Sequence, residues 1–117
     1  MLQKYAPVKM VFIFAALFCF ATKVFSNSDD QKAFALAKQN ACLGCHAVDK
    51  KIVGPSFQSV AQKYKHDQSA TTFLKNKITK GGSGSWGVVP MPANAKLSDA
   101  DLSVLVSWIL RGAPDVN

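Results

Sequence analysis

Two cysteines and a histidine lie close together in the segment ACLGCHAVD, residues 41–49. Cys42 and Cys45 are three positions apart, and His46 follows the second cysteine directly. Two thiols beside an imidazole could serve as a redox dithiol, as part of a zinc site, or for the covalent attachment of haem. The chain has 117 residues and only 3 cysteines, so the rest of the sequence has to discriminate between these chemistries.

The first two chemistries need partners that this sequence does not offer readily. A thioredoxin-like dithiol is expected beside alternating strands and helices. Only the segment SWGVV at 85–89 approaches the alternation of apolar and polar residues that is typical of a strand. A structural zinc ion takes four ligands, and His66 is the only histidine besides His46. The adjacent positions of Cys45 and His46 also fit a tetrahedral site poorly.

Covalent haem attachment explains the spacing directly. Positions i and i+3 of a helical turn lie on one side, so Cys42 and Cys45 can both form thioethers along one edge of a porphyrin. His46 then falls beneath the iron, where one ring nitrogen ligates while the other donates to a backbone carbonyl. The C-x-x-C-H signature is typical of this use, and we predict one covalently bound haem c as the cofactor.

The other face of the iron decides what such a site does. An open face would allow the binding of a gas or the activation of peroxide, whereas a second strong ligand leaves only electron exchange. Outside the first 26 residues, the candidates for this ligand are His66 and Met91. His66 lies in the charged segment KYKHDQ, but Met91 stands between Pro90 and Pro92, which stiffen the backbone around it. We therefore predict His46 and Met91 as the axial ligands, a combination that raises the reduction potential.

The amino terminus has the pattern of a secretory signal. Lys4 and Lys9 precede an apolar run over 11–21, which is shorter than the roughly 20 residues that a membrane span needs. We predict a signal peptide over 1–26 and one domain over 27–117, with an uncleaved anchor as the alternative. Export implies a periplasmic location, and Cys42 and Cys45, the only cysteines beyond the signal, are too few for a disulfide framework.

The elements that must position these residues are all helical by their apolar spacing. Apolar residues recur at helical intervals in four segments, which lie at 28–40, 57–64, 70–80 and 98–110. In the first of them Ala33, Phe34, Ala37 and Ala41 fall on one side, and the apolar positions of the last two include Leu74 and Ile109. Lys80 and Gly81 are a typical helix end, and Ser98 with Asp101 resembles a capping box. Between these two signals, the segment 81–96 reads as an ordered loop that keeps Trp86, Val88, Val89 and Met91 from water. The predicted fold class is all-α.

Three segments together carry a family resemblance: CLGCHAVDKKIVGPSF, GSGSWGVVPMPANA and the terminal LVSWIL. They resemble the small bacterial class I c-type cytochromes of the cytochrome c-551 type, and the resemblance covers residues 30–112. It implies a small cytochrome c fold, with about four helices wrapped around one covalently bound haem. It also implies that the first and last helices cross, and we choose Phe34 and Trp108 as their aromatic contact, although Trp108 could equally face the haem.

The resemblance also implies roles for residues around the haem. Pro55 would offer its carbonyl to the proximal histidine, and Trp86 would bind a haem propionate through its indole nitrogen. Asn94 would contact the methionine sulfur and tune the potential. Lys77 stands where such proteins often place an arginine near a propionate, but a lysine lacks the bidentate fork.

Charge and resemblance together predict a periplasmic one-electron carrier that transforms no substrate and acts as a monomer. Residues 27–117 hold 11 lysines and arginines against 7 aspartates, and no arginine cluster or aromatic series indicates nucleic-acid binding. Candidate partners are a quinol-oxidising complex, a terminal oxidase, a nitrite reductase or a peroxidase. Lysines that could steer acidic partners are Lys50, Lys51, Lys63, Lys75 and Lys96. The alternatives are a haem enzyme or gas sensor with an open iron, and a haem subunit docked on an oxidoreductase.

Overall fold

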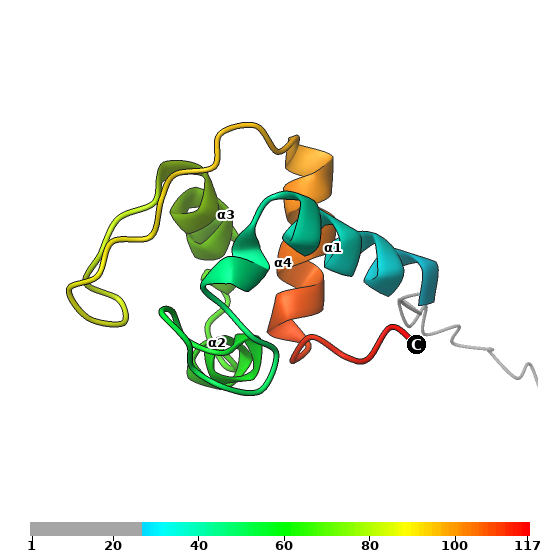
Figure 1. The fold of residues 1–117 in the computed structure, drawn as a ribbon, viewed down its shortest axis with the longest axis horizontal. Coiled ribbons are helices and arrows are strands. Elements are labelled where there is room, and N and C mark those ends of the chain that lie inside the picture. The colour runs from blue at the N-terminus through cyan, green and yellow to red at the C-terminus, as the bar shows by residue number, and fades with distance from the viewer. Residues whose placement is uncertain (1–26) are drawn as a thin grey trace, which may run out of the picture.

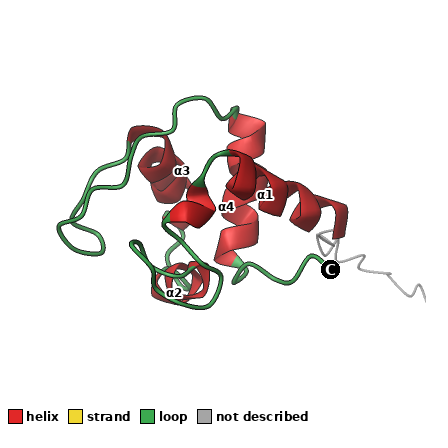
Figure 2. Cartoon of the chain, viewed as in Figure 1, coloured by secondary structure: helices red, strands yellow, loops and turns green. Residues whose placement is uncertain are grey.

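The computed structural model describes residues 27–117, and its helices confirm the predicted all-α class (Figures 1 and 2). In this part of the chain no helix is long and apolar enough to cross a membrane. The predicted signal peptide over 1–26 lies outside the described residues. The elements in chain order are α1 (Asn27–Gln39), the 3-10 turn η1 (Cys42–Gly44), α2 (Phe57–Lys63), α3 (Ala70–Lys80) and α4 (Asp99–Leu110).

The predicted end of α3 and start of α4 are confirmed. α3 ends at Lys80, and Gly81 follows with a φ of 68°, a conformation that a residue with a Cβ adopts rarely. At α4, the Ser98 hydroxyl accepts a hydrogen bond from the backbone of Asp101 at 3.1 Å. Bonds from Lys32 and then Ser98 hold the pKa of the Asp101 carboxyl below its ordinary value. These contacts therefore stabilise the fold at neutral pH and weaken as the pH falls through that lowered pKa.

α1 crosses α4, as Figure 1 shows, and the two helices form the centre of the core. The α1 side of the contact is built from small residues, because Ala33 and Ala37 are 0% exposed. Beside them, the rings of Phe34 and Trp108 meet edge to face with centroids 6.1 Å apart, which confirms the predicted aromatic contact. Ion pairs from Arg111 to Asp30 and from Lys32 to Asp101 join the same two segments.

Trp108 also connects this core to α2. Its ring lies 5.4 Å from that of Phe57, again close to edge to face, and its indole nitrogen donates to the carbonyl of Pro114 at 3.1 Å. The side chain is only 1% exposed. Trp108 is thus a packing residue between α1 and α2, and it does not line the large cavity described below.

Two local expectations were wrong. Ala41 was expected on the buried face of the first helix, but it is exposed and adopts a left-handed φ of 59°, which ends the helical path before η1. Trp86, Val88 and Val89 were expected to be kept from water, yet they are 44%, 90% and 62% exposed. They lie in the loop that extends away from the helices in Figure 1.

Candidate functional site

The two cysteines of the C-x-x-C-H segment flank a single 3-10 turn. This turn has three residues per revolution, so Cys42 and Cys45 emerge on the same side of η1, and both are free and half-buried. Burial, followed by the nearby Cys45, raises the pKa of the Cys42 thiol, although its own backbone partly opposes the rise. Within residues 27–117 no group of three or more His, Cys, Asp or Glu side chains is placed to hold a metal ion, so the surroundings of the two thiols do not favour a zinc site.

His46 is held in one orientation by the segment that follows it. Its Nδ1 lies 2.7 Å from the carbonyl oxygen of Pro55. A carbonyl only accepts, so Nδ1 must carry the proton and Nε2 presents its lone pair. The imidazole also stacks on the ring of Phe57, with centroids 5.5 Å apart and planes 18° from parallel. The ring is therefore prepared to ligate a metal through Nε2.

Gly54 also lies against the imidazole of His46. A Cβ at this position would come within 2.5 Å of Cε1 and 2.8 Å of Nδ1 of His46. Such distances require movement, but Phe57 and Pro55 already fix the ring on its other sides. The glycine before the proline is therefore required by the close approach of the backbone to His46. This role of Gly54 was not predicted from the sequence.

Replacing Gly54 by alanine is expected to displace the imidazole and to destabilise the holoprotein by about 1–3 kcal/mol, the usual cost of overpacking. Denaturant unfolding followed by circular dichroism and by haem absorbance measures both effects. Gly44→Ala is the matched control, since a Cβ there meets nothing within 4 Å. Equal behaviour of the two variants would show that the imidazole is not confined.

An apolar cavity, partly open to solvent, lies between η1, α2, α3, α4 and the 81–96 loop. Cys42, His46 and Met91 all line it. The rest of the wall is mainly apolar, and its large side chains are Phe57, Val60, Tyr64, Phe73, Leu74, Ile78, Leu105 and Ile109. An apolar cavity with a thiol, an imidazole nitrogen and a thioether fits a covalently attached haem.

Met91 is placed by the loop formed by residues 81–96. Its backbone forms a reciprocal pair with Gly82, with both N···O distances 2.9 Å. Gly81 lies so close that a Cβ there would come within 2.3 Å of the carbonyl oxygen of Met91. The base of the loop is fixed by Asn94, whose backbone nitrogen donates to Ile78 of α3 at 2.8 Å. Met91 is consequently half-buried at the cavity rather than loose at the surface.

The remaining predicted site residues differ in whether they line the cavity. Pro55, Trp86 and Lys77 line the cavity, whereas Cys45 and Asn94 lie outside its lining. The side-chain amide of Asn94 donates to the side-chain oxygen of Asn40, the residue after α1, at 3.1 Å, rather than to the sulfur of Met91. Trp86 is 44% exposed, and the ammonium of Lys63 lies over its ring at 4.4 Å. From the sequence, Lys63 was predicted only as a positive charge that could steer acidic partners.

An all-α fold around an apolar cavity, with a C-x-x-C-H turn at its wall, defines a small c-type haem protein. The family comparison names the class further, because the cytochrome c family model matches residues 31–113. This chain belongs to the cytochrome c family, and its cofactor is one covalently bound haem c. The predicted family resemblance and the small cytochrome c fold are thereby confirmed.

Individual relatives agree with this assignment. Cytochrome c-552 of Nitrosomonas europaea is 49% identical over 75 residues, which cover 64% of this chain and 73% of the relative. Cytochrome c-551 of Allochromatium vinosum is 48% identical, with 64% of this chain and 80% of the relative covered. The crystal structure of wild-type Nitrosomonas europaea cytochrome c552 superposes with a TM-score of 0.64 at 47% identity, covering 68% of this chain and 98% of that one. These relatives are all small c-type cytochromes.

Proposed function

We propose that this protein is a periplasmic one-electron carrier whose haem iron is held by His46 and Met91. One observation carries the proposal: an imidazole with its Nδ1 on Pro55 and a loop-held thioether line the same apolar cavity as Cys42. Cys42 and Cys45 form the two thioethers. The haem, when bound, supplies reversible one-electron exchange, and the two ligands keep small molecules from the iron.

The roles of the other residues follow from their chemistry. Pro55 fixes the tautomer of His46, and the apolar wall excludes water. A methionine opposite a histidine favours the ferrous state and raises the potential. Trp86 lines the cavity and carries an indole N–H that can donate to a haem propionate. Asn94 affects the reduction potential only indirectly, because its side-chain amide donates to Asn40. A signal over 1–26, removed from a domain over 27–117, would deliver the chain to the periplasm.

Visible spectra of the exported protein test the proposal. We expect c-type haem bands in the reduced form and a weak charge-transfer band of sulfur on ferric iron at the red end of the oxidised spectrum. Haem bands without the sulfur band, together with rapid carbon monoxide binding by the ferrous protein, would favour an open-iron enzyme or sensor. Absence of covalent haem would contradict the assignment of Cys42 and Cys45.

The partners are expected to be acidic redox proteins, such as a quinol-oxidising complex, a terminal oxidase, a nitrite reductase or a peroxidase. Among the steering candidates, Lys50, Lys51 and Lys96 make no ion pair within residues 27–117, whereas Lys75 is bound to Asp99 at 2.9 Å. Unpaired ammonium groups can meet partner carboxylates without first breaking a bond.

Electron transfer with an acidic partner is therefore expected to slow as salt is added. Between about 0.01 M and 1 M salt the Debye length falls from about 30 Å to about 3 Å, and the second-order rate constant should fall about tenfold or more. Stopped-flow measurements across this range provide the test. Lys96→Gln should reduce the salt dependence more than Lys75→Gln, whose charge is already paired. A rate constant that does not change with salt would remove electrostatic steering.

A further inference from the structure

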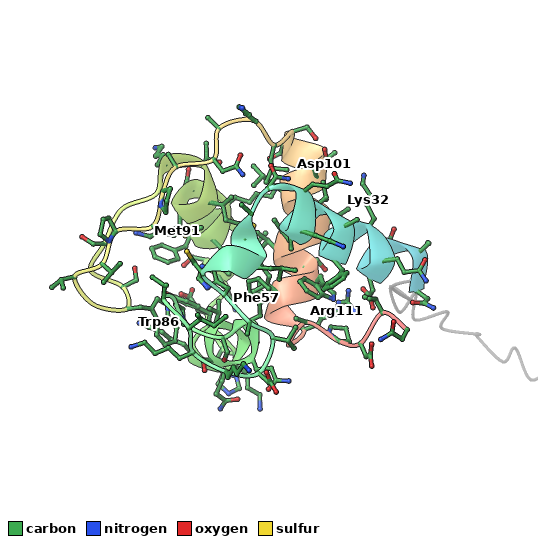
Figure 3. All side chains as sticks on the ribbon, in the orientation of Figure 1. Lys32, Phe57, Trp86, Met91, Asp101 and Arg111 are labelled. Carbon is green, nitrogen blue, oxygen red and sulfur yellow. The ribbon has the colours of Figure 1, made fainter. Side chains whose placement is uncertain are left out.

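Lys63, in the last turn of α2, reaches across to the 81–96 loop. Its ammonium donates to the carbonyl oxygen of Ser85 at 2.5 Å and lies 4.4 Å from the centre of the Trp86 ring. The ring of Tyr64, next to it in sequence, is 5.7 Å away. Lys63 makes no ion pair within residues 27–117. Its polar contacts therefore hold α2 to the loop, and Figure 3 shows Trp86 on the side of the loop that faces α2.

The outer part of this loop has few other attachments. The base is bound through Asn94 to Ile78, and Gly82 pairs with Met91. Beyond that pair, Gly84 donates only to Gly87 within the loop itself. Over residues 83–90 the hydrogen bond from Lys63 is the one that joins this part to another element of the described chain. No charged residue occurs between Lys80 and Lys96, so no ion pair of the loop's own side chains can replace it.

We propose that Lys63 is a positioning residue for Met91: its contacts with Ser85 and Trp86 hold the loop closed over the cavity. The inference rests on the proposed ligation of the iron by Met91. The backbone pair of Gly82 and Met91 joins the two sides of the loop. A loop that swings away from α2 pulls on that pair and therefore displaces Met91. Loss of the Lys63 contacts therefore increases the fraction of molecules in which the Met91 sulfur has left the iron.

The chain offers variants that separate this role from a general effect of charge. Lys63→Met keeps a long aliphatic side chain but removes the cation that Trp86 and Ser85 contact. Lys63→Arg keeps a cation that both donates hydrogen bonds and stacks on aromatic rings. Lys65→Met is the matched control, because it removes the same charge two residues away from an exposed side chain that makes no ion pair within residues 27–117.

The test titrates the ferric holoprotein with imidazole and follows the sulfur-to-iron band. Imidazole binds only where the methionine has left, so its apparent affinity reports the open fraction. Lys63→Met should bind imidazole about tenfold more tightly than the wild type, as expected from losing one cation–π contact and one hydrogen bond. Lys63→Arg should restore affinity to within about twofold of the wild type, and Lys65→Met should leave it unchanged.

Hydrogen exchange provides a second readout that does not depend on the iron ligand. The amide of Gly84 and the indole of Trp86 should exchange about tenfold faster in Lys63→Met, whereas the amides of α4 should be unaffected. Unchanged imidazole affinity and exchange in Lys63→Met would overturn the proposal, as would an equal effect of Lys65→Met. A wild-type protein without the sulfur band would instead contradict ligation by Met91, and the exchange comparison would still decide whether Lys63 holds the loop.

Discussion

Replacing Met91 by alanine is expected to abolish the sulfur-to-iron band and to lower the reduction potential by on the order of 0.1 V or more, within the span of about 0.8 V that axial ligands control. The physical reason is that the thioether stabilises the ferrous state relative to water or hydroxide. Spectroelectrochemical titration measures the potential and the band together. The same variant should bind carbon monoxide rapidly in its ferrous form, because nothing then occupies that face of the iron.

Two further variants make this prediction specific to the ligand. Met91→His should keep six-coordinate iron and resist carbon monoxide, but still lose the sulfur band and the high potential. Val89→Ala changes another side chain of the same loop that lines the cavity, and should preserve both properties. If Met91→Ala kept the native potential and band, the assignment of this ligand would be wrong.

Replacing Trp108 by alanine is expected to have the largest effect on stability, about 3–5 kcal/mol of unfolding free energy. The ring is 1% exposed and contacts Phe34 of α1 and Phe57 of α2. Its removal creates a cavity between these helices and leaves the carbonyl of Pro114 without its donor. Phe57 in turn stacks on His46, so the haem absorbance should also change at lower denaturant concentration.

Denaturant unfolding of the holoprotein, followed by far-ultraviolet circular dichroism, measures this loss. Trp108→Phe should cost less, since an aromatic ring is retained and only the indole donor is lost. Trp86→Ala removes the same residue type from a position that is 44% exposed, and should change the unfolding free energy by less than about 1 kcal/mol. Similar losses for the two alanine variants would contradict the central role of Trp108.

The local features of this fold could be predicted from the sequence because their signals are local. The boundaries of α3 at Ala70 and Lys80 follow from apolar spacing and the glycine that comes next. The C-x-x-C-H spacing fixes how far apart the two thiols and the imidazole lie along the chain, whereas the contact of Pro55 with His46 was implied by the family resemblance. The crossing of α1 and α4 came from the family resemblance, since nothing in either helix alone specifies its partner.

The rest depended on contacts that periodicity does not encode. Leu74 and Ile109 lie at apolar positions of the predicted helices and are buried, but spacing does not distinguish a protein core from the wall of a cofactor cavity. Asn94 contacts Asn40 across 54 positions, and Lys63 reaches Ser85 across 22. Val88 was expected to be kept from water because it is apolar, but it is exposed. A loop tip has no neighbouring element to bury it.

The pairing of the first described helix with the last one has a consequence for how the chain matures. Ala33 and Ala37 of α1 are buried at the crossing with α4, whose residues are made some 60 positions later. If the chain is exported amino terminus first, as we propose, α1 has no docking surface until α4 has also passed. During that interval Cys42 and Cys45 lie in an open chain, accessible to the thioether chemistry that the closed fold would hinder. The order of the helices thus provides a time window for haem attachment before folding is complete.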